Sequence, residues 1–391
     1  MGDTSEAPLA GIVVLDMSRL QPGGFCTRLL ADLGADVVKI EGPGGDPSRM
    51  WGGPEPSPSA VALHRGKRSL TLDLKHARAA EVLRRLVADA DVLLESARPG
   101  SLEASGIGYP QLSAVNPRLV WCSLSGFGLT GPKRDHAGHD ITYLGHAGVL
   151  GLMADVDAVP DQPRLLLAAP MGGMMAALGI TSALAQRANT GRGCMVDASI
   201  ADAAMWLMTE EVTRSARNLA PYDLRTPARR VYPCADGRRV SVAAAEPRTW
   251  VALCTALELT DLGDRPGGPP DAAADTVARI GAALATKPAA HWADVLGGAG
   301  VAMVNDTGDL VDDPQVQARG GVTTLDVGAG TDQVVTSPLR FSTSDAASDD
   351  GWSGPGPMGF SAPGADTDAV LATAGFTDDE IATLRADGVV A

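Results

Sequence analysis

Residues 137–143 (AGHDITY) hold the side chains best suited to acid–base chemistry in this chain. His139 can bind or release a proton near neutral pH, and Asp140 places a carboxylate next to it. Thirty residues further on, the chain has a second Gly-bearing turn at residues 169–173 (APMGG). Such a histidine can act as a general acid or base, but it can equally be a buried ring whose nitrogens bond to backbone groups. These residues alone leave both interpretations open.

Residues 64–69 (HRGKRS) form the densest group of basic side chains in an acidic chain. A strand predicted over residues 69–74 follows at once and leads to Lys75, and Arg98 comes just after a strand predicted over residues 91–95. Open parallel sheets bind ligands beyond the carboxyl ends of their strands, and cationic side chains bind phosphates well. We therefore expect a polyphosphate site here, although a solvated turn is the usual explanation for a short basic run.

The composition excludes several classes of protein. The chain has 391 residues and a formal net charge of −15, whereas binding to nucleic acid or to an acidic membrane needs a basic surface. No CxxC pair occurs, so neither a disulfide framework nor a metal site is expected. The first ten residues lack a hydrophobic signal segment, and no apolar run is expected to span a bilayer. We therefore expect a cytoplasmic protein. The cysteines are Cys26, Cys122, Cys194, Cys234 and Cys254.

The order of the predicted elements favours an α/β fold. Residues 11–16 and 35–41 are typical of buried strands, residues 18–24 of a loop, and residues 25–33 of a helix closed by Gly34. A strand, a helix and a strand in this order form a βαβ unit and imply a parallel sheet. The GxGxxG pattern is absent, so no nicotinamide or flavin cofactor is expected. Helices are also predicted over residues 76–89, 171–188 and 248–257, and a capping box at Thr377 predicts the start of the last helix.

Several separated motifs resemble one family of proteins. They occur in the order found in class III CoA transferases and α-methylacyl-CoA racemases, and together they cover nearly the whole chain. Residues 137–141 with Tyr143 resemble the racemase branch in particular. The motifs are residues 29–41 (LLADLGADVVKIE), 45–49 (GDPSR), 65–69 (RGKRS), 72–75 (LDLK), 98–100 (RPG), 190–193 (TGRG) and 235–238 (ADGR).

The resemblance implies a two-domain fold. A large Rossmann-like CoA-binding domain with a parallel sheet would comprise residues 1–215 and 320–391, and a smaller inserted α+β domain with its linkers would comprise residues 216–319. An interlocked homodimer is implied as well. The substrate would be an acyl-CoA thioester, with coenzyme A present as part of that substrate and no covalently bound cofactor. No metal, nucleic acid or membrane is implied.

The resemblance also assigns roles to individual residues. His139 matches the catalytic histidine of the family, and Glu246 matches the glutamate that pairs with it in racemases. Asp140, which follows the histidine, is the third residue expected to be catalytic. Contacts with CoA are implied for three segments. These are Leu72, Asp73, Leu74 and Lys75; Ser96, Ala97 and Arg98; and Gly138, Ile141, Thr142 and Tyr143.

One position departs from the family pattern. The turn before the Gly-rich helix carries an aspartate in the family, which is the nucleophile in transferases and the second proton carrier in racemases. Here the matching residue is Pro170. Proline is well tolerated at the start of a helix, but its ring cannot ionise. A shifted acid is an alternative, since Asp155, Asp157 and Asp161 lie in the preceding loop.

Three functions therefore stay open. In the first, His139 removes the proton next to the thioester carbonyl, and backbone N–H groups at the start of a helix near Met171 stabilise the enolate. This chemistry would give epimerisation, isomerisation or elimination. In the second, the chain is a transferase that moves CoA between carboxylic acids, because Gln21 resembles a glutamine that some transferases use. In the third, the chain binds CoA thioesters but has lost catalysis.

Overall fold

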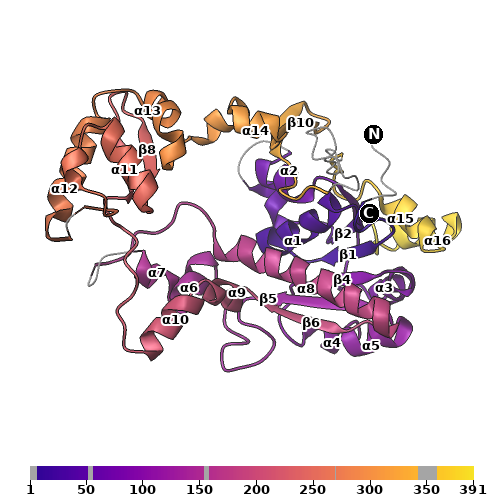
Figure 1. The fold of residues 1–391 in the computed structure, drawn as a ribbon. Helices are drawn as coiled ribbons and strands as arrows, with labels where there is room; N and C mark the ends of the chain where they lie inside the picture. Colours follow the sequence, from indigo (N-terminus) through magenta and orange to yellow (C-terminus); the bar gives the residue numbers. More distant parts are fainter. Residues whose placement is uncertain (1–6, 52–55, 154–157, 269, 342–358) are drawn as a thin grey trace. The chain divides into compact units, whose positions relative to one another are not determined.

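The computed structural model describes residues 7–51, 56–153, 158–268, 270–341 and 359–391. The chain forms two compact units, Met1–Val212 with Gln315–Ala391 and Thr213–Pro314. The first unit contains both ends of the chain (Figure 1). The domain boundaries inferred above, at residues 215 and 320, stay a prediction.

The larger unit is built on a six-stranded parallel sheet, which confirms the α/β class. Its order is β3-β2-β1-β4-β5-β6, and β1 pairs in parallel with both β2 and β4. The strands at residues 13–17, 36–41 and 92–95 are mostly buried and rich in Val, Leu and Ile, because both faces of the sheet are covered. The six strands are β1 (Val13–Met17), β2 (Asp36–Glu41), β3 (Lys67–Thr71), β4 (Val92–Glu95), β5 (Val120–Ser125) and β6 (Met195–Ser199).

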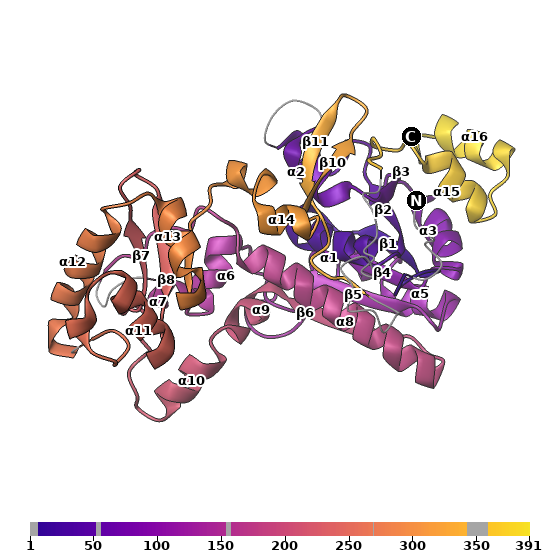
Figure 2. The ribbon, with the colours of Figure 1, turned by 45° about the horizontal axis from the view of Figure 1, so that its top comes forward.

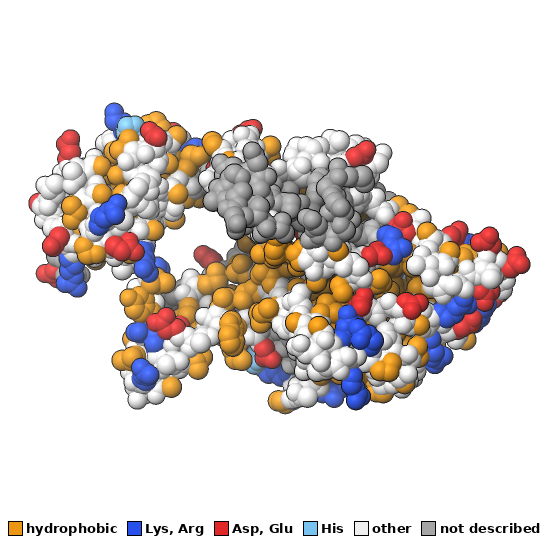
Figure 3. Space-filling view, turned by 45° about the vertical axis from the view of Figure 1, so that its right-hand side comes forward, with side chains coloured by type: hydrophobic (Ala, Val, Ile, Leu, Met, Phe, Trp, Pro, Cys, Tyr) orange, Lys and Arg blue, Asp and Glu red, His pale blue; other side chains and the backbone are white. Residues whose placement is uncertain are grey.

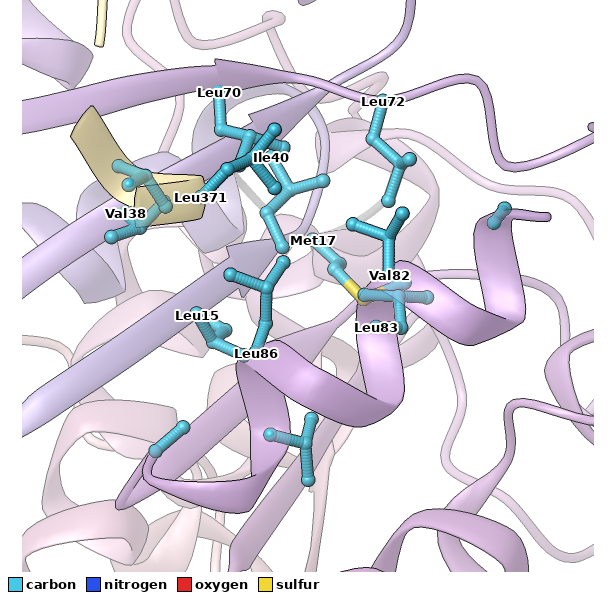
Figure 4. Close-up of a cluster of buried hydrophobic side chains, with 14 of the residues drawn as sticks. Leu15, Met17, Val38, Ile40, Leu70, Leu72, Val82, Leu83, Leu86 and Leu371 are labelled. Carbon is cyan, nitrogen blue, oxygen red and sulfur yellow. The ribbon is translucent and has the colours of Figure 1, made fainter. Parts of the chain in front are cut away.

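Alternate strand residues pack on opposite faces of this sheet. Leu15 and Met17 belong to one hydrophobic core and Val14 to the other, as the period of two in a strand requires. The first core is covered by α3 (Ala79–Ala88), α5 (Tyr109–Val115), α15 (Thr367–Thr373) and α16 (Asp378–Ala386). Figure 4 shows Leu15, Val38, Leu86 and Leu371 meeting in this core.

Helices α1 (Leu20–Asp32), α8 (Ala168–Thr190) and α9 (Ile200–Trp206) contribute to the second core. Figures 1 and 2 show α8 running along α1 and across β5 and β6. Glycines allow the close approach: a Cβ at Gly173 would lie 2.4 Å from the carbonyl oxygen of Pro22. The start of α1 therefore lies against the first turns of α8.

The expected loop at residues 18–24 is wrong, because α1 already begins at Leu20. Gly23 and Gly24 lie inside the helix, where a Cβ at Gly23 would meet the Ser18 Oγ at 2.0 Å. These glycines allow close packing rather than a turn. Helix α8 likewise begins at Ala168, earlier than the predicted residue 171, so Pro170 lies in its first turn. Gly34, with φ of 95°, follows α1 as expected, and the capping box at Thr377 starts α16.

Helix α8 also corrects the statement that no apolar run is long enough to span a bilayer. Its 23 residues are long and apolar enough to cross a membrane, by length and composition alone. Its buried residues belong to the second core of the larger unit, and the core helix of a soluble protein can be equally long and apolar. One such helix is weak evidence for a membrane span.

The remaining elements of the larger unit are short. Strands β10 (Val322–Asp326) and β11 (Thr331–Val335) form an antiparallel hairpin. The helical segments are η2 (Pro47–Met50), α2 (Pro58–His64), α4 (Ser101–Ala104), α6 (Asp140–His146), α7 (Val149–Leu152) and α14 (Pro314–Ala318), and α10 (Thr209–Ala216) leads into the smaller unit.

The smaller unit packs helices on a three-stranded antiparallel sheet in the order β7-β8-β9. Trp250 and Trp292 are buried in its core. The strands are β7 (Arg229–Pro233), β8 (Arg239–Ala243) and β9 (Val301–Met303). The helical segments are α11 (Pro247–Ala256), η3 (Thr260–Leu262), η4 (Pro270–Ala272), α12 (Ala273–Leu284), α13 (Ala289–Leu296), η5 (Gly297–Ala299) and η6 (Thr307–Val311).

Candidate functional site

A cavity of about 590 Å³ opens at the carboxyl ends of the central strands of the larger unit. Strands β1 and β4 are neighbours, but the chain leaves β1 toward β2 and β3 on the other side. This is the point of an open α/β sheet at which ligands usually bind. The lining includes residues 19–22 after β1, 96–99 after β4, 124–126 at the end of β5, 134–141, Tyr143, Leu144, Leu165, Leu166, Ala169 and Ile200.

His139 is exposed and lines this cavity, so the interpretation as a buried ring is wrong. The residue precedes α6 with extended backbone angles. Its carbonyl oxygen accepts the N–H groups of Thr142 and Tyr143 at 2.8 and 3.2 Å. Backbone hydrogen bonds thus fix the position of the residue and leave the imidazole accessible.

Tyr143 fixes the turn that carries His139. The phenol donates to the carbonyl oxygen of Gly138 at 2.8 Å, and burial raises the pKa of this phenol, which keeps it protonated as a donor. A Cβ at Gly126 or Gly138 would lie 2.5 or 2.7 Å from the Tyr143 side chain. Only glycine therefore fits at either position without displacing the ring.

The carboxylate of Asp140 binds the start of α8. Its Oδ2 accepts the N–H of Leu167 at 3.1 Å, and its Oδ1 accepts that of Ala169 at 2.8 Å. A negative charge is favourable at this end of a helix. Asp140 therefore connects the His139 turn to α8.

These bonds overturn the prediction that an enolate is stabilised by N–H groups at the start of the helix near Met171. The N–H groups of Leu167 and Ala169 already bind Asp140. Pro170 has no N–H, and the N–H of Met171 donates to the carbonyl oxygen of Leu167 at 3.2 Å. The first turn of α8 therefore offers few donors to a ligand.

Three arginines supply positive charge to the cavity: Arg19, Arg98 and Arg134. All three side chains are exposed. The N–H of Arg19 donates to the Oγ of Ser96 at 2.9 Å, which joins the loops after β1 and β4. Guanidinium groups in such positions are suited to phosphate oxygens.

The basic cluster at residues 64–69 does not form the expected polyphosphate site. Arg65 makes two bonds to the carboxylate of Asp32, at 2.7 and 2.9 Å, and both residues are buried. Lys67 lies 3.1 Å from Asp16, and the buried ring of His64 contacts Ser48. The prediction fails because carboxylates from elsewhere in the chain already pair with these cations.

A buried charge network joins Asp16 on β1, Lys39 on β2 and Lys67 at the start of β3. Asp16 is 0% exposed and contacts Lys67 at 3.1 Å, Lys39 at 3.5 Å and the hydroxyl of Thr27 at 2.6 Å. Burial by itself would raise the pKa of Asp16, but the two ammonium groups and the hydroxyl donors outweigh it and hold this pKa well below its usual value. Asp16 therefore stays ionised in the interior.

The cavity brings together many, but not all, of the residues assigned from the sequence. Those in its lining are Ser96, Ala97, Arg98, Gly138, His139, Asp140, Ile141 and Tyr143. Residues outside the lining are Leu72, Asp73, Leu74, Lys75 and Thr142. The Leu72 side chain belongs to the core, and the N–H of Asp73 donates to the carbonyl oxygen of Val389. Glu246 lies in the smaller unit, where it precedes α11 and contacts Thr249. The roles given to these residues stay predictions.

None of the three acids considered as substitutes for the family aspartate is found in the lining of the cavity, as far as the structure describes them. Asp155 and Asp157 lie outside the described residues. Asp161 is exposed and is absent from the lining. The carboxylates that do line the cavity are Asp135 and Asp140. Sequence reasoning overlooked Arg19, Leu20 and Arg134, although the position of Arg19 and Leu20 directly after β1 is a usable signal.

The chain is similar to known proteins over much of its length. The chain matches the model of CoA-transferase family III over residues 9–356. Human alpha-methylacyl-CoA racemase is 41% identical over 261 residues, which are 64% of this chain and 65% of that protein. Succinyl-CoA–D-citramalate CoA-transferase of Chloroflexus aurantiacus is 34% identical over 272 residues, 66% of this chain and 67% of that protein.

The matched part of the chain thus spans about 65% of the length of the human racemase. Solved structures match over more of the chain. The crystal structure of a CAIB/BAIF family protein from Brucella suis has a TM-score of 0.81 and 28% identity, and the match covers 94% of this chain and 99% of that one.

Proposed function

The chain belongs to CoA-transferase family III, and from this premise we propose that it acts on an acyl-CoA thioester at the carbon next to the carbonyl. His139 is the base that removes the proton. The observation that carries this proposal is that His139 is exposed in the same cavity as Arg19, Arg98 and Arg134. A cationic end for phosphates and a titratable group that can take a proton are what such a substrate requires.

The developing enolate oxygen also needs hydrogen-bond donors. Because α8 is capped by Asp140, we assign this role to the first N–H groups of α6, those of Asp140 and Ile141. Both residues line the cavity beside His139. The leading N–H groups of a helix have no intrahelical acceptor, so they are available to a ligand.

Pro170 limits what this arrangement does efficiently. A fast racemase needs a proton carrier on each face of the α-carbon, and proline cannot supply one. A single base exchanges the proton on one face, whereas inversion depends on a proton delivered from water on the other. We therefore propose that the protein catalyses proton exchange, isomerisation or elimination rather than rapid racemisation.

CoA transfer is the second candidate, and it rests on the transferases among the relatives. Transfer needs a free carboxylate to form an anhydride with the acyl group. Both oxygens of Asp140 are engaged with α8, and Asp135, the other carboxylate in the described lining, lies 3.5 Å from the guanidinium of Arg134. An acyl-enzyme adduct trapped with hydroxylamine, together with CoA exchange, would favour transfer. Tight CoA binding without either reaction would favour a protein that has lost catalysis.

The test of the proposed function is incubation of a panel of acyl-CoAs in deuterated water with the purified protein. Mass spectrometry then reports deuterium at the α-carbon and, in the same sample, movement of CoA to an added carboxylic acid. The proposal expects label without transfer.

Removing the guanidinium of Arg98 should weaken CoA binding about 10- to 100-fold, because a charge-assisted hydrogen bond to phosphate contributes roughly 1.5–3 kcal/mol. Selection among acyl groups should not change. Calorimetric titration of Arg98→Ala with CoA and with acyl-CoAs checks this. Arg84→Ala is the matched control, since it removes an exposed positive charge outside the cavity. Equal CoA affinity in the Arg98 variant and the wild type would contradict this placement of the phosphates.

We also propose that the protein is a homodimer. Large apolar side chains are exposed on α8, β6 and α9: Met174, Met175, Leu178, Met195, Met205 and Trp206. Figure 3 shows hydrophobic side chains grouped on the surface of the larger unit. Extended apolar patches of this kind are typical of interfaces.

Leu178→Asp should therefore shift the protein toward the monomer, because a charge would be buried in the interface. Light scattering after size-exclusion chromatography should give twice the chain mass of 40.0 kDa for the wild type. Val115→Asp on α5 is the control, since it also places a charge at an exposed apolar position but on the other face of the sheet. A monomeric wild type would refute the dimer.

A further inference from the structure

Leu20, at the start of α1, has a strained backbone. Of the described residues other than glycine, three have φ in the left-handed region: Leu20 at 63°, Asn218 at 57° and Glu258 at 59°. A left-handed conformation brings the Cβ too close to the following carbonyl oxygen. Asparagine tolerates it, whereas a bulky leucine is a genuine outlier. Of these three residues, only Leu20 lines the cavity.

The surrounding structure holds this conformation from several sides. The N–H of Leu20 donates to the carboxylate of Asp46 at 3.2 Å, and Asp46 is only 3% exposed and lies 3.3 Å from Lys39. The preceding residue, Arg19, donates its N–H to Ser96. The N–H of Ser18 donates to Asp16 at 3.0 Å. Strain persists where neighbours over-determine a conformation, and such residues cluster at functional sites.

The strained turn lies where an acyl group would meet the protein. The start of α1 packs against the first turns of α8, where Gly173 is in close contact with Pro22. A Cβ at Gly172 would lie 2.8 Å from the Cγ1 of Ile200, so α9 flanks the same turns. Leu20 and Ile200 both line the cavity, and so do Leu144 and Ala169. These side chains make an apolar wall near the start of α8, which Asp140 links to His139.

We infer that Leu20 determines specificity: its strained backbone is retained because it places the side chain as a wall for an aliphatic acyl group. This inference rests on the proposed function, because it assumes an acyl-CoA thioester in the cavity. It goes beyond it by naming the residue that selects the acyl group and the chemical class that the residue prefers.

The strain is tested by comparing Leu20→Gly with Leu20→Ala. Both variants remove the leucine side chain from the apolar wall, but only glycine relieves the left-handed strain. The thermal midpoint of Leu20→Gly should lie about 2 °C or more above that of Leu20→Ala. At an unstrained position alanine is the more stable of the two. Glu258→Gly and Glu258→Ala form the matched control, with the same order of midpoints expected at a residue outside the cavity.

The role in specificity is tested by calorimetric titration with CoA and with hexanoyl-CoA. Both Leu20 variants should bind hexanoyl-CoA about tenfold more weakly than the wild type, as expected for a lost apolar contact. Their affinity for CoA itself should stay within about twofold. The Glu258 variants should match the wild type for both ligands.

The outcomes separate this inference from the proposed function. A wild type that binds neither ligand would overturn both. A wild type that binds both ligands, with Leu20 variants that bind hexanoyl-CoA equally tightly, would overturn only the role of Leu20. A thermal midpoint of Leu20→Ala at or above that of Leu20→Gly would show that the backbone of residue 20 is not strained, and would overturn the inference.

Discussion

His139→Ala is expected to lower the rate of α-proton exchange about 10²–10⁴-fold, the usual contribution of a positioned general base. Folding should survive the change, because the bonds that place residue 139 involve its backbone carbonyl oxygen. The rate is measured as deuterium uptake into an acyl-CoA in deuterated water, with the circular dichroism spectrum as a check on folding.

His136→Ala is the matched control for this variant. His136 is also exposed and lines the same cavity three residues earlier, so its removal costs one imidazole without removing the proposed base. Exchange should remain near the wild-type rate. If both variants lost exchange equally, or if His139→Ala kept it, His139 would not be the base.

Asp16→Ala is expected to destabilise the protein by about 3–5 kcal/mol, because removing one partner of a buried ion pair leaves an uncompensated charge. Asp16 is 0% exposed, and its loss would leave Lys39 and Lys67 without that carboxylate. Denaturant unfolding of the variant and the wild type gives the difference in the free energy of unfolding.

Asp36→Ala provides the comparison for Asp16→Ala. Asp36 also forms an ion pair, with Arg68, but its side chain is 46% exposed. Exposed pairs contribute about 0–1 kcal/mol. A cost for Asp16→Ala no larger than that of Asp36→Ala would contradict the view that the buried network stabilises the fold.

The carboxylate of Asp16 also determines how the stability of the protein depends on pH. Its pKa in the folded protein lies below the unfolded value of about 3.9. The unfolded chain therefore binds more protons in acid, and the stabilisation is complete above about pH 4 to 5 and declines as the pH falls below that range. Asp46 and Glu41 have lowered pKa values as well and act in the same direction. Stability of the wild type should fall more steeply in acid than that of Asp16→Ala.

Local patterns predicted the fold well. The alternation of strand, helix and strand at residues 11–41 was enough for a parallel sheet, and Gly34 and the capping box at Thr377 marked helix ends through their own backbone requirements. The glycines at positions 23 and 24 led to the wrong prediction of a loop. They lie inside a helix and allow the close approach of Ser18 and Leu63. A turn and a close contact need the same residue type.

The site depended on partners that sequence spacing does not reveal. The cations at residues 65 and 67 pair with Asp32 and Asp16, which lie on other elements. Asp140 was expected to act together with the histidine, yet its carboxylate caps a helix that begins 28 residues later. By contrast, the rule that ligands bind at the strand ends pointed to Arg98, and this residue does line the cavity.

The most direct test of the central claim is deuterium incorporation at the α-carbon of an acyl-CoA by the wild-type protein, with transfer of CoA to an added acid followed in the same sample. The account predicts deuterium at the α-carbon, slow inversion of configuration and no transfer. An unlabelled thioester, with or without CoA moved to the added acid, would contradict it.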